Sequence, residues 1–288
     1  MRVKTARPWA AALAVVVLAC FASESGAQVV NPNRGRITFI GGFDFATAYV
    51  FRGLLQEDTG VVMWPYTEAT VDLFRGQEGL KSVTFHLGTW NSLHTGDTGY
   101  NDGFGKLWYE SDLYGTLGVR FGPDITVAAT YTAYMSPNDS FTTVKELSVK
   151  GAVDDAGSLG IALRPYGLVA FELDTLPGMR QADGGTSGGT YFEAGVAPGW
   201  VDPDFRVEFP IKVGISLDDY YELAGVDQKF GFLSLAAIAT VPISGATAYG
   251  SWNVHGGVEF LSLGNTPEAF NGGDQTKVIA SIGIGFNY

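Results

Sequence analysis

The last segment of the chain, Thr276 to Tyr288, alternates strictly between apolar and small or polar residues. Val278, Ala280, Ile282, Ile284, Phe286 and Tyr288 share one face, and Lys277, Ser281, Gly283, Gly285 and Asn287 share the other. A period of two is typical of a β-strand whose faces meet two environments. The apolar face must lie against a core or against lipid.

The same alternation recurs along the chain and predicts about twelve strands. Their approximate ranges are Arg36 to Val50, Val61 to Phe74, Ser82 to Trp90, Trp108 to Phe121, Ile125 to Tyr134, Thr142 to Val153, Ile161 to Leu173, Thr190 to Val201, Phe205 to Leu217, Phe230 to Val241, Ala246 to Phe260 and Thr276 to Tyr288. Most exceed the ~5–6 residues usual in soluble proteins and reach the ~9–11 needed to cross a bilayer.

The connections alternate in length. Short ones fall at 75–81, 122–124, 154–160, 202–204 and 242–245, and nearly all of the intervening ones are longer, at 51–60, 91–107, 135–141, 174–189, 218–229 and 261–275. Outer-membrane barrels combine tight periplasmic turns with long extracellular loops, whereas a soluble sandwich has no reason to sort its loops. We therefore expect an all-β, antiparallel transmembrane β-barrel in the bacterial outer membrane.

The N-terminus predicts export. Arg2, Lys4 and Arg7 precede an apolar run at 10–21, and small residues end at Ala27. This pattern is typical of a cleavable signal peptide at 1–27, followed by a periplasmic segment at 28–35 and the barrel at 36–288. Cleavage at this site would also remove Cys20, the only cysteine. A lipoprotein signal ending at Cys20 is the weaker alternative.

Composition excludes several classes of function. The chain carries 18 Lys and Arg against 30 Asp and Glu, without a basic run, so we expect no nucleic-acid partner. Its 39 glycines fit strands and turns better than helices, since glycine costs roughly 1 kcal/mol inside a helix. We expect neither a cofactor nor a metal site.

The polar strand faces, placed inward, predict the groups that line the lumen. The candidates are Asp44, Arg52, Glu68, Asp72, Glu110, Asp112, Arg120, Glu146, Lys150, Arg164, Glu172, Glu193, Arg206, Glu208, Lys212, His255 and Glu259. Charges of both signs either line a water-filled pore or neutralise one another in a network that plugs it, and the sequence leaves both open.

Aromatic residues near the strand ends suggest girdles at the membrane interfaces. The candidates are Tyr49, Phe51, Trp64, Trp90, Trp108, Trp200, Phe209, Phe260 and Tyr288. Pro165, Pro198 and Pro210 lie inside predicted strands, where each removes a ladder hydrogen bond, so we expect bulges near them.

An outer-membrane esterase would need a serine beside a histidine near the outer rim. Only His86, His94 and His255 are present, and no motif pairs any of them with a serine. Ordinary loop or lumen histidines are the favoured interpretation.

Three segments resemble the TorF family of porins, also called Gcw_chp: Ala48-Tyr49-Val50-Phe51-Arg52-Gly53 with Gln56, Gly88-Thr89-Trp90-Asn91-Ser92, and Tyr109-Glu110-Ser111-Asp112-Leu113-Tyr114-Gly115. The resemblance implies an outer-membrane barrel with a channel role. It also implies that Arg52, Glu110 and Asp112 are lumen groups, in permeation or in a structural salt bridge.

We therefore expect a porin-like channel for passive diffusion of small hydrophilic solutes. A closed structural or adhesive barrel is the first alternative, and a lipid-modifying enzyme is the less favoured one. The expected partners are outer-membrane lipid and lipopolysaccharide, small solutes, and the barrel assembly machinery, which would contact the C-terminal strand ending at Tyr288.

Overall fold

The structure is a computed structural model that describes residues 35–99, 104–122, 124–155, 162–173, 188–202, 204–243 and 250–288. The predicted signal peptide lies outside these residues, as does the predicted periplasmic segment except for its last residue.

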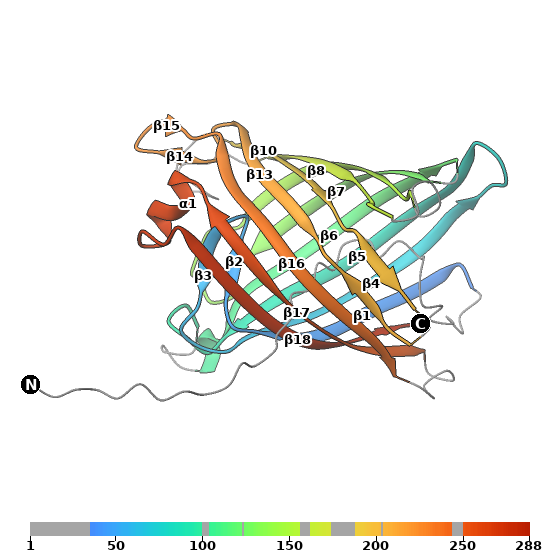
Figure 1. Cartoon of the computed structure of the whole chain (residues 1–288), viewed down its shortest axis with the longest axis horizontal. Coiled ribbons are helices and arrows are strands. Elements are labelled where there is room, and N and C mark those ends of the chain that lie inside the picture. Colours follow the sequence, from blue (N-terminus) through green and yellow to red (C-terminus); the bar gives the residue numbers. More distant parts are fainter. Residues whose placement is uncertain are drawn as a thin grey trace, which may run out of the picture.

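Apart from two short hairpins, the described strands form one closed antiparallel ring (Figure 1). In ring order they are β1 (Ile37–Ala46), β4 (Val62–Arg75), β5 (Leu80–His94), β6 (Trp108–Phe121), β7 (Ile125–Met135), β8 (Val144–Val153), β9 (Tyr166–Glu172), β10 (Thr190–Val196) with β11 (Gly199–Val201), β12 (Arg206–Glu208) with β13 (Ile211–Asp218), β16 (Phe230–Ile243), β17 (Ser251–Leu263) and β18 (Thr276–Asn287). Pairing of β18 with β1 closes the ring. The predicted all-β barrel with about twelve strands is confirmed.

Two of the twelve strands are interrupted at proline. Pro198 separates β10 from β11, and Pro210 separates β12 from β13. The register continues unchanged across the second break, because Glu208 pairs with Ile238 and Ile211 pairs with Leu235. The register is also unchanged across Pro198, because Gly195 pairs with Lys212 and Gly199 pairs with Glu208. The bulges expected at Pro198 and Pro210 are therefore wrong, and each of these prolines only removes its own N–H donor from the ladder. Pro165 lies directly before β9 rather than inside a strand.

The two ends of the barrel differ. The turn end carries short connections and the C-terminus (Figure 1). The loop end carries β2 (Tyr49–Phe51), β3 (Leu54–Glu57), the 3₁₀-helix η2 (Phe104–Lys106), β14 (Glu222–Leu223), β15 (Val226–Asp227) and α1 (Asn265–Phe270). Among the described residues, no helix is long and apolar enough to cross a membrane.

Strand β18 shows how the residues divide between the two faces. Val278 and Ile282 are 61% and 53% exposed on the outside, whereas Ile279 and Ser281 are 2% and 1% exposed on the inside. Large exposed apolar side chains recur on the outer faces of the other strands. An apolar exterior around a hydrogen-bonded ring without free edges is the arrangement that a lipid bilayer requires. The protein is an outer-membrane β-barrel.

One predicted strand is wrong at its end. The first strand was expected to continue to Val50, but β1 ends at Ala46. Residues 49–57 instead form a separate hairpin, β2–β3, which pairs with itself rather than with the ring.

Candidate functional site

The β2–β3 hairpin turns at Arg52 and Gly53. Their φ values of 48° and 88° both lie in the left-handed region, as in the two-residue turns that favour tight hairpins. Glycine adopts such a φ without cost, but arginine does so only where its surroundings compensate. The contacts of the Arg52 side chain supply this compensation.

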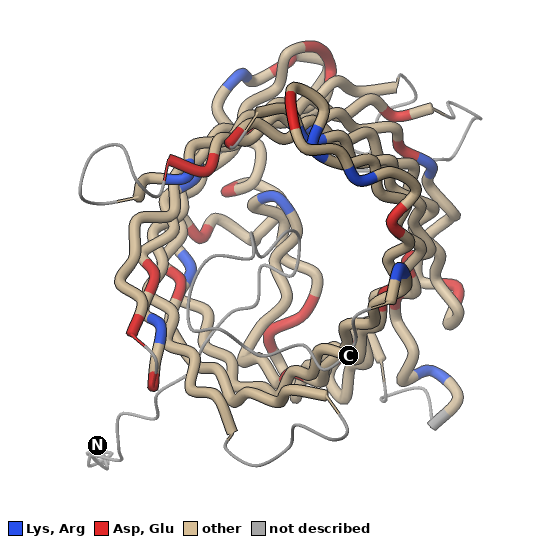
Figure 2. Tube along the Cα trace, turned by 90° about the vertical axis from the view of Figure 1, so that its right-hand side faces the viewer, with Lys and Arg blue, Asp and Glu red and all other residues tan. Residues whose placement is uncertain are grey.

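The hairpin crosses the interior of the barrel. It leaves the wall at β1, yet its tip contacts residues of β8 and β10. In the ring order, β8 and β10 each lie five strands from β1, in opposite directions, so the tip reaches the far wall. Figure 2 looks into the ring from the turn end and shows chain segments inside it.

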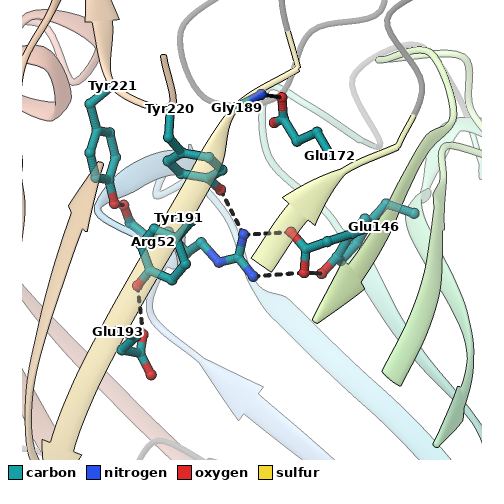
Figure 3. Close-up of polar contacts among 9 residues, drawn as sticks. Arg52, Glu146, Glu172, Gly189, Tyr191, Glu193, Tyr220 and Tyr221 are labelled. Atoms are coloured by element: carbon teal, nitrogen blue, oxygen red, sulfur yellow. Dashed lines mark hydrogen bonds and ion pairs between the residues drawn. The ribbon is translucent and has the colours of Figure 1, made fainter. Parts of the chain in front are cut away.

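The Arg52 guanidinium is held on several sides (Figure 3). Its two terminal nitrogens donate to the two carboxylate oxygens of Glu146, at 2.7 and 2.9 Å. One of them also donates to the Tyr220 hydroxyl at 2.9 Å, and the group lies 4.2 Å from the centre of the Tyr191 ring. A bidentate carboxylate beside aromatic faces is a strong arrangement for a guanidinium.

This ion pair is sealed from water. The side chains of Arg52 and Glu146 are 11% and 3% exposed, and Tyr220 and Tyr191 are each 1% exposed. Burial alone would lower the pKa of Arg52, but the charge and hydrogen bond of Glu146, together with the nearby tyrosines Tyr220 and Tyr134, outweigh burial and keep that pKa well above its usual value. The guanidinium is therefore a permanent charge with a dedicated counter-ion.

Further hydrogen bonds fix the backbone of the hairpin. The Tyr221 hydroxyl donates to the carbonyl of Arg52 at 2.7 Å. Asn271, which follows α1, accepts from the amide of Leu55 and donates to the carbonyl of Gly53, both at 2.8 Å. The hairpin thus joins two other loops of the loop end into one packed unit.

Glu57 anchors the base of the hairpin. One of its oxygens accepts from the amide of Thr59 at 2.7 Å, and the other accepts from the amide and hydroxyl of Thr98, at 2.8 and 2.7 Å. Burial would raise the pKa of Glu57, but these hydrogen bonds outweigh it and lower the pKa to about 2. Glu57 is 3% exposed, so it is a buried and ionised anchor.

An aromatic cluster packs beneath the hairpin. Tyr49 lies 5.8 Å from Trp64, 5.3 Å from Trp90 and 6.5 Å from Tyr109, measured between ring centres. Tyr49 and Trp64 are 6% and 5% exposed, so their expected place in a membrane girdle is wrong. Tyr49 belongs to the hairpin itself, and Trp64 of β4 packs against it inside the ring.

Other girdle candidates are exposed on the barrel. Trp108, Trp200, Phe209, Phe260 and Tyr288 are 45%, 69%, 50%, 40% and 44% exposed. Their exposure agrees with the outward position expected of girdle residues.

Many predicted lumen charges meet a partner inside the ring. His255 contacts Asp44 at 2.7 Å, His86 contacts Glu68 at 2.8 Å, and Lys212 lies 3.4 Å from Glu259. Asp44 is fully buried. Each pair joins inward-facing side chains, either of two neighbouring strands or of two strands with one strand between them. The period-two alternation predicts this inward placement.

Toward the turn end, two arginines share one carboxylate. Arg164 donates to Glu208 at 3.0 Å, and Arg206 donates to the same oxygen. The Lys150 ammonium lies 4.3 Å from the centre of the Tyr166 ring. The side chains of Arg164, Glu208 and Arg206 are 11%, 16% and 18% exposed. The difference from the Arg52–Glu146 pair lies mainly in the carboxylate, since Glu146 is 3% exposed.

The remaining lumen candidates lie either nearer the loop end or nearer the turn end. Glu110 and Asp112 are 5% and 8% exposed, on the part of β6 that lies nearer the loop end. Asp72 pairs with Arg75, and Arg120 is exposed, both near the turn end. At the loop end, Glu172 accepts from the amide of Gly189 at 2.6 Å, and Glu193 accepts from the Tyr191 hydroxyl at 2.7 Å.

A serine and a histidine do meet near the loop end. The Ser92 hydroxyl lies 2.7 Å from His94 Nε2, and His94 Nδ1 lies 2.6 Å from the Thr98 hydroxyl, which donates to Glu57. The sequence does not mark this pair with a motif: Ser92 and His94 are simply two residues apart on one face of β5. Ser92 and His94 are both 0% exposed, and Ser92 accepts from the Trp64 indole at 3.0 Å. This chain of hydrogen bonds is buried structure without room for a substrate.

No protein-family model and no curated protein sequence matches the chain. Among solved structures, it is similar to an outer-membrane channel from Pseudomonas putida F1, with a TM-score of 0.47 and 10% identity over 89% of this chain and 97% of that chain. It is also similar to the NanC porin, with a TM-score of 0.42 and 14% identity over 87% and 98% of the two chains. These likenesses concern the barrel fold and do not extend to a solute.

Proposed function

We propose that the protein is an outer-membrane channel that passes small hydrophilic solutes by passive diffusion. The observation that carries this proposal is the polar inner wall of a barrel whose outer wall is apolar. Charged groups of the inner wall toward the turn end, such as Arg206 and Glu208 at 18% and 16%, retain exposure to water. Wall charges of this kind filter solutes by charge and size.

In this proposal the predicted lumen residues have two roles. Lys150, Arg164, Arg206, Glu208 and Lys212 shape the field that a solute meets. The residues around the hairpin, namely Arg52, Glu110, Asp112 and Glu146, set how far the loop half is open.

A closed structural barrel is the second candidate. It is favoured by one observation: the hairpin tip is bonded to the far wall through the buried Arg52–Glu146 pair. A barrel that stays closed in this way would serve as a surface or scaffold protein.

Two finer assignments extend the channel proposal. The motifs around Arg52, Trp90 and Glu110 support a place in the TorF family. The barrel assembly machinery would bind the exposed face of β18, which ends near Tyr288. The acidic outer loops would bind lipopolysaccharide through divalent cations.

The decisive experiment is single-channel recording of the refolded mature protein in planar bilayers, together with liposome swelling in neutral sugars. Discrete openings and sugar-dependent swelling are expected. A folded, heat-modifiable barrel that is silent in both assays would replace the channel by the structural role.

A further inference from the structure

The surroundings of the Arg52 guanidinium form a pocket in their own right. Its walls come from four separate parts of the barrel: Glu146 from β8, Tyr191 from β10, Tyr220 from the loop before β14, and Tyr134 from β7. The Tyr134 hydroxyl donates to Glu146 at 3.2 Å and so orients the carboxylate. The hairpin contributes the cation itself and the ring of Phe51, whose centre lies 4.9 Å from the guanidinium carbon.

The chemistry of this pocket is that of a receptor for organic cations. It offers a carboxylate that binds two parallel N–H groups, a hydroxyl oxygen, and two aromatic faces, from Tyr191 at 4.2 Å and Tyr220 at 5.4 Å. Such a combination selects a planar, weakly hydrated guanidinium over a small metal ion, and takes a primary ammonium less well.

We infer that this pocket is a recognition site for guanidinium and primary ammonium groups, which the chain fills with its own Arg52 and which a cationic solute fills when the hairpin moves. The hairpin then acts as a gate. Arg52 holds it closed and competes with the solute for the same site. The link to transport rests on the proposed channel function, but the cation site itself does not.

The charges around the pocket support a cation rather than an anion. If Arg52 leaves, Glu146 stays buried without its counter-ion. A second carboxylate, Glu193, lies on the other side of Tyr191 and accepts a hydrogen bond from the Tyr191 hydroxyl at 2.7 Å. Lys212, the other nearby cation, is already paired with Glu259 at 3.4 Å. A buried carboxylate without a partner is strongly unfavourable, so a vacant pocket recruits a cation.

Competition explains why the gate stays closed in dilute solution. Arg52 is tethered by a short hairpin, and such tethering gives an effective concentration on the order of millimolar or higher. Free cations must exceed this level to displace Arg52 in the wild type. A variant that lacks the arginine should bind them at much lower concentration.

The test uses Arg52→Ala and, as matched control, Arg52→Ala with Glu146→Gln. Guanidinium chloride is the probe and potassium chloride at equal ionic strength is the reference. Calorimetric titration of the refolded proteins in detergent should show binding to Arg52→Ala that is at least roughly tenfold weaker in the control, because the carboxylate provides the charge-assisted bonds. If Arg52→Ala does not refold, Arg52→Gln is measured instead, since it keeps the length of the side chain.

Bilayer recordings separate this inference from the channel proposal. In the wild type, guanidinium above the millimolar range should raise the mean conductance toward the level of Arg52→Ala, and potassium chloride at equal ionic strength should not. Calorimetric binding in a barrel that never conducts would refute the channel but leave the cation site standing. Conducting variants that bind guanidinium no better than the control would overturn the cation site.

Discussion

The loop half and the turn half of the lumen use charge in opposite ways. At the loop end, the Arg52–Glu146 pair is sealed, with Glu146 only 3% exposed. At the turn end, Arg206 and Glu208 pair as well, but they keep 18% and 16% of their exposure. The first pair holds a segment in place, and in the proposed channel the second pair would leave charge available to a solute. Under that proposal, similar residue types serve packing in one half and charge selection in the other.

The largest effect should come from breaking the sealed pair. Arg52→Ala leaves Glu146 as a buried unpaired carboxylate, which costs about 3–5 kcal/mol when a pair of this kind loses one partner. We expect a lower urea midpoint and a higher mean conductance. The control is Arg52→Met with Glu146→Met, which should come close to wild-type stability because apolar pairs often replace buried ion pairs without loss. Equal stability of Arg52→Ala and wild type would contradict the sealed pair.

The second-largest effect should come from acid, which protonates Glu57 and thereby weakens the base of the hairpin. The pKa of Glu57 is lowered from 4.5 to about 2, so its anchoring is fully present above pH 4.5 and is lost as the pH falls toward 2. Tryptophan fluorescence from the cluster beneath the hairpin should change over that window. Glu57→Gln should shift the starting signal and flatten the acid transition, and an unchanged transition in this variant would assign it to another group.

A smaller effect is expected at the turn of the hairpin. Gly53 has a φ of 88°, which costs an L-residue roughly 1–2 kcal/mol. Gly53→Ala should therefore raise the frequency of openings without changing ion selectivity. Gly122→Ala is the matched control, since Gly122 also has a positive φ, of 55°, but lies at the turn end. If the two variants open equally often, the hairpin does not control opening.

The smallest change in stability should follow from the turn-half arginines. Arg206→Gln leaves Glu208 paired with Arg164 at 3.0 Å, so the loss of stability should be smaller than in Arg52→Ala, which leaves its carboxylate without a cation. The reversal potential in a salt gradient should nevertheless shift toward cations, since one positive wall charge is lost. A large loss of stability with unchanged selectivity would show that this half of the lumen is packed like the loop half.

The barrel could be predicted from the sequence because its signal is local and repeated. In β18, parity alone separated Val278 and Ile282 outside from Ile279 and Ser281 inside. The hairpin could not be predicted, because Tyr49, Phe51 and Arg52 continue the pattern of β1, and Arg-Gly is not a familiar hairpin turn. A positive φ at Arg52 becomes evident only from the backbone.

The pairing of the lumen charges could likewise be predicted only in part. Parity placed Asp44 and His255 on inward faces, but which carboxylate each cation meets depends on strand order and on the hairpin that crosses the ring. The sequence by itself determined the strands and their two faces, because period-two alternation is a local signal. Closure of the ring depends on the pairing of β18 with β1. Only the tertiary structure decided that Arg52 meets Glu146, 94 positions away, because that contact depends on where a hairpin without its own lipid-facing side can pack.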